Sequence, residues 1–110
     1  MPEPDSGAPV ATPELDTDSA AKLLPPYHVI IENDDDHTQD FVINVLRKVF
    51  GHPVEKAFEL MMVAHETGES VVWTGPKEVA ELKYEQILTF HQHRDGKDIG
   101  PLSCRIEPAE

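Results

Sequence analysis

Basic residues and cysteine are scarce in this sequence. Lysine and arginine number 9 against 21 aspartates and glutamates, for a formal net charge of −12. Proteins that bind nucleic acid or anionic membranes need a basic surface, so we expect neither partner. The single cysteine, Cys104, excludes an internal disulfide and a cysteine metal cluster.

Long apolar runs are also lacking. No run approaches the roughly 20 residues that span a membrane, and the acidic, proline-rich start Met1–Asp5 lacks a signal-peptide pattern. We therefore expect a soluble, cytoplasmic protein. Its acidic charge would favour a cationic ligand or a basic partner surface.

Proline is concentrated in the first 26 residues. This stretch holds six of the ten prolines, and its five acidic residues and one lysine give it a charge of −4. Large apolar residues are scarce before Leu23, so burial could not offset the entropy lost on ordering. We predict a disordered extension over residues 1–24 and one small domain over 25–110.

The predicted domain alternates strand and helix patterns. β-Branched residues, or an alternation of apolar and polar residues, predict three strands, at residues 27–31, 70–74 and 102–106. Apolar residues at one-turn spacing predict three helices, at residues 38–50, 53–68 and 77–93. A loop is expected at 95–101. The order β-α-α-β-α-β predicts a small α+β sandwich with its helices on one face of the sheet.

An acidic turn, Asn33–Asp36, follows the first predicted strand. Its three consecutive carboxylates repel one another, so a compensating group is needed nearby. The N–H groups and dipole at the start of the next helix supply part of the compensation, and a bound cation could supply the rest. The residue types also fit an ordinary capping turn, whereas the spacing lacks the pattern of a calcium loop.

Three other features are ambiguous by pattern alone. His65 lies among apolar positions near the end of the second predicted helix, where a lone histidine is more often structural than a ligand. Glu78 and Lys83 fit a solvated face of the third helix. His91 and His93 make a poor metal pair, because residues two apart on a helix point in different directions.

Together these segments resemble the ClpS family, the adaptors of the ATP-dependent Clp protease. The resemblance rests on several motifs at family order and spacing: PPYHVIIENDD at 25–35, FVINVL at 41–46, VEKA at 54–57, His65, Gly68, EVAE at 78–81, Lys83, and Pro101-Leu102 with Cys104. It covers nearly all of 25–108, and the set is specific although no single motif is. It implies a three-stranded antiparallel sheet with three helices, similar to the C-terminal domain of the bacterial ribosomal stalk protein.

The resemblance implies a binding protein rather than an enzyme, with no cofactor or metal. Family members bind proteins whose first residue is Leu, Phe, Tyr or Trp and deliver them to a ClpA- or ClpC-type unfoldase for degradation by ClpP. Matching positions imply α-amino binding by Asn33, Asp34, Asp35 and His65. They imply a hydrophobic pocket at Val42, Met61, Ala64 and Leu102, with His37 and Gln39 at its rim. They imply an unfoldase interface at Glu78 and Lys83, in a protein that we expect to be a monomer.

Four positions near this site depart from the family pattern. His37 and Gln39 stand where the family usually has Thr and Met, Thr38 where it usually has Pro, and Ala64 where it has Val. The loop before Pro101 is also longer by a few residues, and no role is assigned to it. These departures concern specificity more than fold, and we expect aromatic first residues to be accepted but not Ile or Val.

Two alternatives follow from the same residues. The first is a ClpS-like domain that binds an unfoldase but has altered or lost recognition of substrate N-termini. The second is a metal-dependent enzyme that uses residues 34–37. Consecutive carboxylates cannot all face one ion, and no second ligand set is evident, so the metal alternative is the weaker one.

Overall fold

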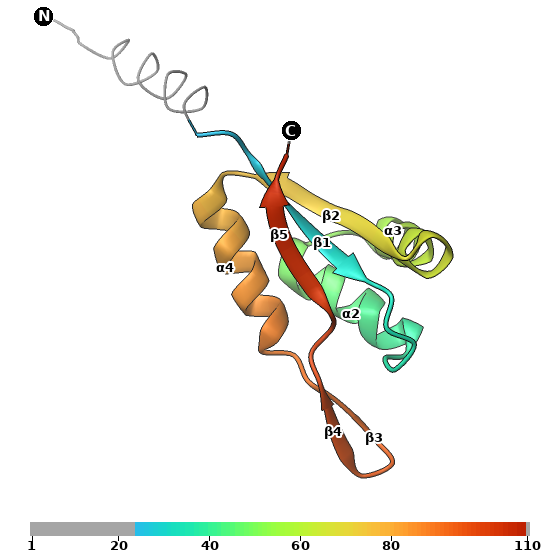
Figure 1. Cartoon of the computed structure of the whole chain (residues 1–110). Coiled ribbons are helices and arrows are strands. Elements are labelled where there is room, and N and C mark those ends of the chain that lie inside the picture. Colours follow the sequence, from blue (N-terminus) through green and yellow to red (C-terminus); the bar gives the residue numbers. More distant parts are fainter. Residues whose placement is uncertain (1–23, 110) are drawn as a thin grey trace, which may run out of the picture.

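The computed structural model describes residues 24–109, so the predicted extension lies outside the described residues except for Leu24. Three strands, β1 (Tyr27–Glu32), β2 (Glu69–Gly75) and β5 (Cys104–Pro108), form an antiparallel sheet in the order β2-β1-β5. Three helices, α2 (Gln39–Phe50), α3 (Val54–Thr67) and α4 (Lys77–Leu88), pack against it (Figure 1). The predicted α+β fold class is confirmed.

The core lies between the helices and one face of the sheet. Strand alternation turns Val29 and Ile31 toward the helices. Buried side chains of both layers form one cluster, which includes Val29, Ile31, Val45, Leu46, Val72, Ala80 and Ile87. On the opposite face Ile30 is also buried, in register with Val71 on β2 and Arg105 on β5.

Local signals bring the end of β1 close to the start of α2 and the end of α3. The Thr38 hydroxyl caps α2 by accepting from the Phe41 N–H at 3.2 Å, as its position before the helix predicts. Gly68 ends α3 at a φ of 101°, in the left-handed region that favours glycine. Its carbonyl accepts from the Asn33 N–H at 3.0 Å, which ties the end of α3 to the acidic turn.

The C-terminal third differs from the sequence prediction. The third helix ends at Leu88 rather than at residue 93, because the polar residues after Phe90 offer no apolar face to the core. A hairpin of β3 (Gln92–Arg94) and β4 (Lys97–Gly100) replaces the predicted loop. Its two turn residues, Asp95 and Gly96, have φ of 55° and 77°, as a type I′ turn requires.

The last strand is also displaced from its predicted position. It begins at Cys104 rather than at Leu102, which lies in the connection before β5 and is buried. Leu102 thus contributes to the interior from irregular backbone. Among the described residues, the helices are all too short or too polar to cross a membrane.

Candidate functional site

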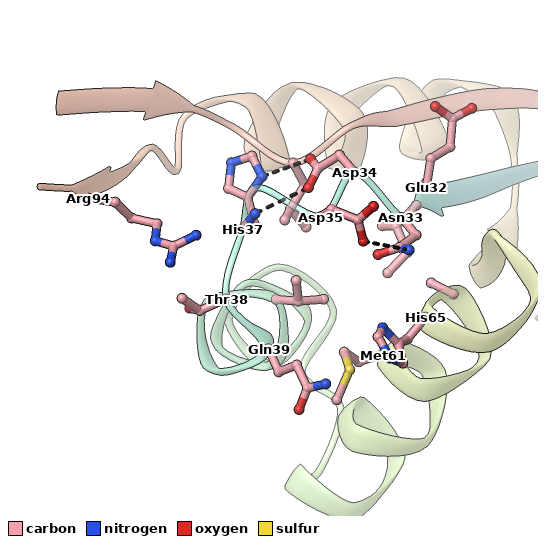
Figure 2. Close-up of a pocket in the computed structure, with 14 residues that line it drawn as sticks. Glu32, Asn33, Asp34, Asp35, His37, Thr38, Gln39, Met61, His65 and Arg94 are labelled. Atoms are coloured by element: carbon pink, nitrogen blue, oxygen red, sulfur yellow. Dashed lines mark hydrogen bonds and ion pairs between the residues drawn. The ribbon is translucent and has the colours of Figure 1, made fainter.

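A cavity of about 280 Å³ lies where the end of β1 meets α2, α3 and the connection before β5 (Figure 2). Its lining includes all ten residues that the resemblance assigned to ligand binding: Asn33, Asp34, Asp35, His37, Gln39, Val42, Met61, Ala64, His65 and Leu102. Ile31, Glu32, Thr38 and Arg94 complete the lining. The structure therefore brings together residues from four separate segments of the chain, while their roles stay predictions.

One end of the cavity is polar. The Asn33 side-chain amide donates to the Asp35 carboxylate at 3.3 Å. Asp35 adopts a φ of 62°, a left-handed conformation that aspartate tolerates better than most residues. His65 extends from the last turn of α3 toward this pair (Figure 2). An amide oxygen, a carboxylate and an imidazole at one end of a cavity suit a cationic group that donates hydrogen bonds.

Asp34 has a different environment from Asp35. Its carboxylate accepts from the Asp36 N–H at 3.0 Å, the His37 N–H at 3.2 Å and the Ser103 hydroxyl at 3.3 Å. Burial raises the pKa of Asp34, but the hydrogen bonds from His37 and Asp36 outweigh it and hold the pKa below its ordinary value. Asp34 therefore shapes the turn, and its oxygens already have several donors.

The His37 side chain is buried in the loop between β1 and α2 rather than exposed at the rim of the cavity. Its side chain is 4% exposed, and its ring stacks on Phe41 with centroids 5.3 Å apart. Nδ1 lies 2.8 Å from the Asp34 carboxylate, and Nε2 lies 2.9 Å from the Gly100 carbonyl. The ring is therefore held between two acceptor oxygens from separate segments of the chain. His37 thus joins the acidic turn to the end of β4.

The other end of the cavity is apolar. Met61 and Ala64 lie three residues apart on the inward face of α3, and Leu102 comes from the connection before β5. All three are buried, whereas Val42 of α2 is half-buried and Gln39 is exposed. Such a wall can surround one apolar side chain and remove it from water.

Two residues of the β3–β4 hairpin also lie near the cavity, and the sequence analysis did not predict them there. Gln92 accepts from the Thr38 N–H at 3.0 Å and donates to the Thr38 hydroxyl at 2.9 Å. Arg94 lines the cavity and donates to the Asp36 carbonyl. The Asp95-Gly96 pair was the signal that could have found them, because it is typical of two-residue hairpins.

The two residues assigned to an unfoldase interface lie on α4 and do not line the cavity. Glu78 is exposed in the first turn. The Lys83 ammonium donates to the Val49 carbonyl at 2.9 Å, which gives this lysine a structural role at the end of α2. Leu82, on the same helix, is 52% exposed.

A metal site has little support from the geometry. Within residues 24–109, no three histidine, cysteine, aspartate or glutamate side chains are arranged to hold an ion. Asp34, the best-placed carboxylate of the acidic turn, already accepts from the protein itself.

Comparison with known proteins identifies the family. The sequence profile of the family described as "ATP-dependent Clp protease adaptor protein ClpS" matches residues 22–105. The chain belongs to the ClpS family. Its function is that of an adaptor of the ATP-dependent Clp protease, as the resemblance implied.

Individual ClpS proteins are similar to this chain over most of their length. The ClpS of Aromatoleum aromaticum is 40% identical over 97 residues, which cover 84% of this chain and 88% of that protein. The ClpS of Roseobacter denitrificans is 37% identical over 97 residues, covering 86% and 80% respectively. A solved structure of Agrobacterium tumefaciens ClpS2 bound to L-phenylalaninamide is 30% identical, with a TM-score of 0.65, and covers 77% of this chain and 98% of that one.

Proposed function

We propose that the cavity binds the first residue of a protein substrate. Asn33, Asp35 and His65 would hold the free α-amino group, and the apolar wall of Met61, Ala64 and Leu102 would surround the first side chain. One observation carries this proposal: the polar and apolar groups line the same cavity, which has room for one large side chain rather than a peptide.

The ligand of the A. tumefaciens structure supports this assignment. L-Phenylalaninamide combines a free α-amino group with a bulky apolar side chain, and its amide stands in for a peptide bond. These are the two features that the two ends of the cavity would recognise. Binding of this kind needs no catalytic group in the adaptor.

The expected affinity follows from the same groups. A charge-assisted hydrogen bond to the α-amino group contributes about 1.5–3 kcal/mol, and burial of a Phe or Leu side chain contributes about 1.5–3 kcal/mol. Association and ordering costs offset part of this sum, so measurable affinity depends on retaining both contributions.

Peptide titration tests the proposal. Peptides that begin with Phe or Leu should bind, and the acetyl-Phe peptide should not, because acetylation removes the charge and a donor. Asp35→Asn, which keeps a residue type that tolerates the φ of 62°, and His65→Ala should each weaken binding about ten-fold or more while the free energy of unfolding changes little. Equal binding of the free and acetylated peptides would refute the proposal.

Specificity at the cavity mouth would depend on Gln39 more than on His37. Gln39 is exposed at the mouth, whereas the His37 ring is held between Asp34 and Gly100. We expect Phe-starting peptides to bind more tightly than Ile-starting ones. Equal affinities would favour a family member with altered N-degron specificity.

The unfoldase would bind the exposed surface of α4. Glu78 and Leu82 are both exposed on this helix, and the partner would be a ClpA- or ClpC-type unfoldase that meets a monomeric adaptor in the cytoplasm. Glu78→Lys combined with Leu82→Ser should abolish unfoldase binding and leave peptide affinity unchanged. Loss of peptide affinity in this variant would show that the two surfaces are not separate.

A further inference from the structure

The β3–β4 hairpin is fixed against the acidic turn at three points. Gln92 makes two hydrogen bonds with Thr38 at the start of α2. On the partner strand, directly opposite Gln92, the Gly100 carbonyl accepts from the His37 ring at 2.9 Å. Arg94 donates from its guanidinium to the Asp36 carbonyl. The hairpin is therefore held by three consecutive residues, Asp36, His37 and Thr38, which connect the acidic turn to α2, and one hydrogen bond orients the Arg94 guanidinium.

Charge is distributed unevenly around the cavity. Among its described lining residues, Arg94 is the only lysine or arginine, whereas Glu32, Asp34 and Asp35 are carboxylates. Figure 2 shows Arg94 on the opposite side of the cavity from Asn33 and His65. One side of the cavity is therefore acidic and suits an α-amino group, and the far side carries an exposed guanidinium.

We propose that Arg94 is a specificity residue that selects substrates with Asp or Glu at the second or third position. This inference rests on the proposed function, because it needs the first residue to occupy the cavity. With about 280 Å³ available, the cavity holds one side chain, so the following residues must lie outside it along the rim. Of the five N–H donors of the guanidinium, one is used by Asp36, and the fork of the others matches a carboxylate.

Because the protein is acidic overall, a preference for Asp or Glu in the substrate requires a local positive charge, which Arg94 supplies. The chain carries a formal charge of −12, which repels an acidic substrate, and the acidic turn adds to this repulsion locally. A cation fixed at the cavity rim would reverse the sign of the interaction at one or two positions of the peptide only. The preference should therefore depend on position and should weaken as salt is added.

Four peptides test this inference by the ratio of their dissociation constants: one with alanine at positions two and three, one with glutamate at position two, one with glutamate at position three, and one with lysine at position two. All begin with Phe and are titrated at low ionic strength. One of the glutamate peptides should bind about two- to five-fold more tightly than the alanine peptide, the range of an exposed ion pair. The lysine peptide should bind more weakly.

Three variants assign the preference to Arg94. Arg94→Gln should bring the glutamate-to-alanine ratio to one, and Arg94→Lys should keep part of it. Lys97→Gln is the matched control, because Lys97 lies opposite Arg94 on the same hairpin but does not line the cavity. It removes the same charge and should leave the ratio unchanged.

The outcomes separate this inference from the proposed function. If the alanine peptide binds and neither glutamate peptide binds more tightly, or if the ratio survives in Arg94→Gln, the role of Arg94 is wrong while substrate binding stands. If the ratio falls equally in Lys97→Gln, the effect is one of general charge and Arg94 is not specific. If the alanine peptide fails to bind at all, the proposed function itself is wrong, and the inference is lost with it.

Discussion

Two charged clusters at the cavity end of the sheet differ mainly in their access to water. The Asp34 cluster (Asp34, His37 and Ser103) lies under the hairpin, and its histidine is 4% exposed. The Arg105 cluster (Arg105 with Glu32, Glu69 and Glu107) lies on the sheet face opposite the helices, and its side chains are 35–53% exposed. Both join distant segments, but water has less access to the Asp34 cluster, whose carboxylate is 20% exposed.

The comparison shows that the number of ion pairs is a poor guide to their importance. Hydrogen bonds with Glu69 and Glu32 raise the pKa of Arg105 far above its ordinary value, yet the group is charged at any physiological pH in either case. Asp34 has a single ion-pair partner, but it also accepts from the backbone N–H groups of Asp36 and His37, the second of which is partly buried. We therefore expect larger effects in the Asp34 cluster.

The largest effect should follow Asp34→Ala. The substitution leaves the His37 ring and two backbone N–H groups without their acceptor, so we expect a loss of about 3 kcal/mol in the free energy of unfolding. Urea denaturation measures this loss. Asp36→Ala is the matched control, because Asp36 is an exposed neighbour whose carboxylate lies outside the cluster. Equal stability of the two variants would contradict the comparison.

A smaller effect should appear on acidification. Because the pKa of Asp34 is lower in the folded protein than in the unfolded chain, its ionisation stabilises the fold above the unfolded pKa. This contribution is fully present at neutral pH and is lost as the pH falls below about 4 and through the folded pKa. Unfolding free energies of the native protein and Asp34→Asn should therefore converge as the pH is lowered. A difference in unfolding free energy that stays the same at every pH would contradict the lowered pKa of Asp34.

The reactivity of the Cys104 thiol tests whether the charges of the Arg105 cluster affect a partly buried group. Burial, with a smaller contribution from the Glu32 carboxylate, raises the pKa of this thiol to about 11. Alkylation at neutral pH should therefore be slow in the folded protein and fast in urea. Glu32→Gln should speed the reaction only slightly, because burial is the larger cause. A large increase in the alkylation rate would mean that the charge of Glu32, rather than burial, controls the reactivity of the thiol.

The smallest effect should follow Arg105→Gln. Its three partners are exposed carboxylates, and exposed pairs contribute little once salt screens them. The melting temperature should fall less than in Asp34→Ala, and the difference from the native protein should shrink at high salt. A fall as large as that of Asp34→Ala would reverse the order of the two clusters.

The elements near the site were predictable to different degrees. Apolar periodicity predicted α2 and α3 well, because their inward faces repeat at helical spacing and Gly51 and Gly68 end them. The third helix was predicted five residues too long, because Phe90 extends the apolar spacing beyond Leu88 and no glycine or proline directly follows to mark the end. The hairpin was missed even though Asp95-Gly96 marks its turn, because three-residue strands give little pattern.

The site was predictable as a set of residues but not as a geometry. The family motifs gave all ten predicted cavity-lining residues. They did not show that Asp34 and His37 bond to each other and to the connection before β5, or that Arg94 lies at the rim. His37 was expected at the rim of the pocket, and its ring is instead held between two acceptors.

The sequence by itself determined the helices, the central strand, the acidic turn and the family, because these depend on residue types at short spacing. Only the tertiary structure decided which atoms satisfy Asp34 and His37. Their partners Ser103 and Gly100 lie 69 and 63 residues away along the chain. Hydrogen bonds over such separations depend on how the whole sheet and its hairpin pack, and no local pattern encodes them.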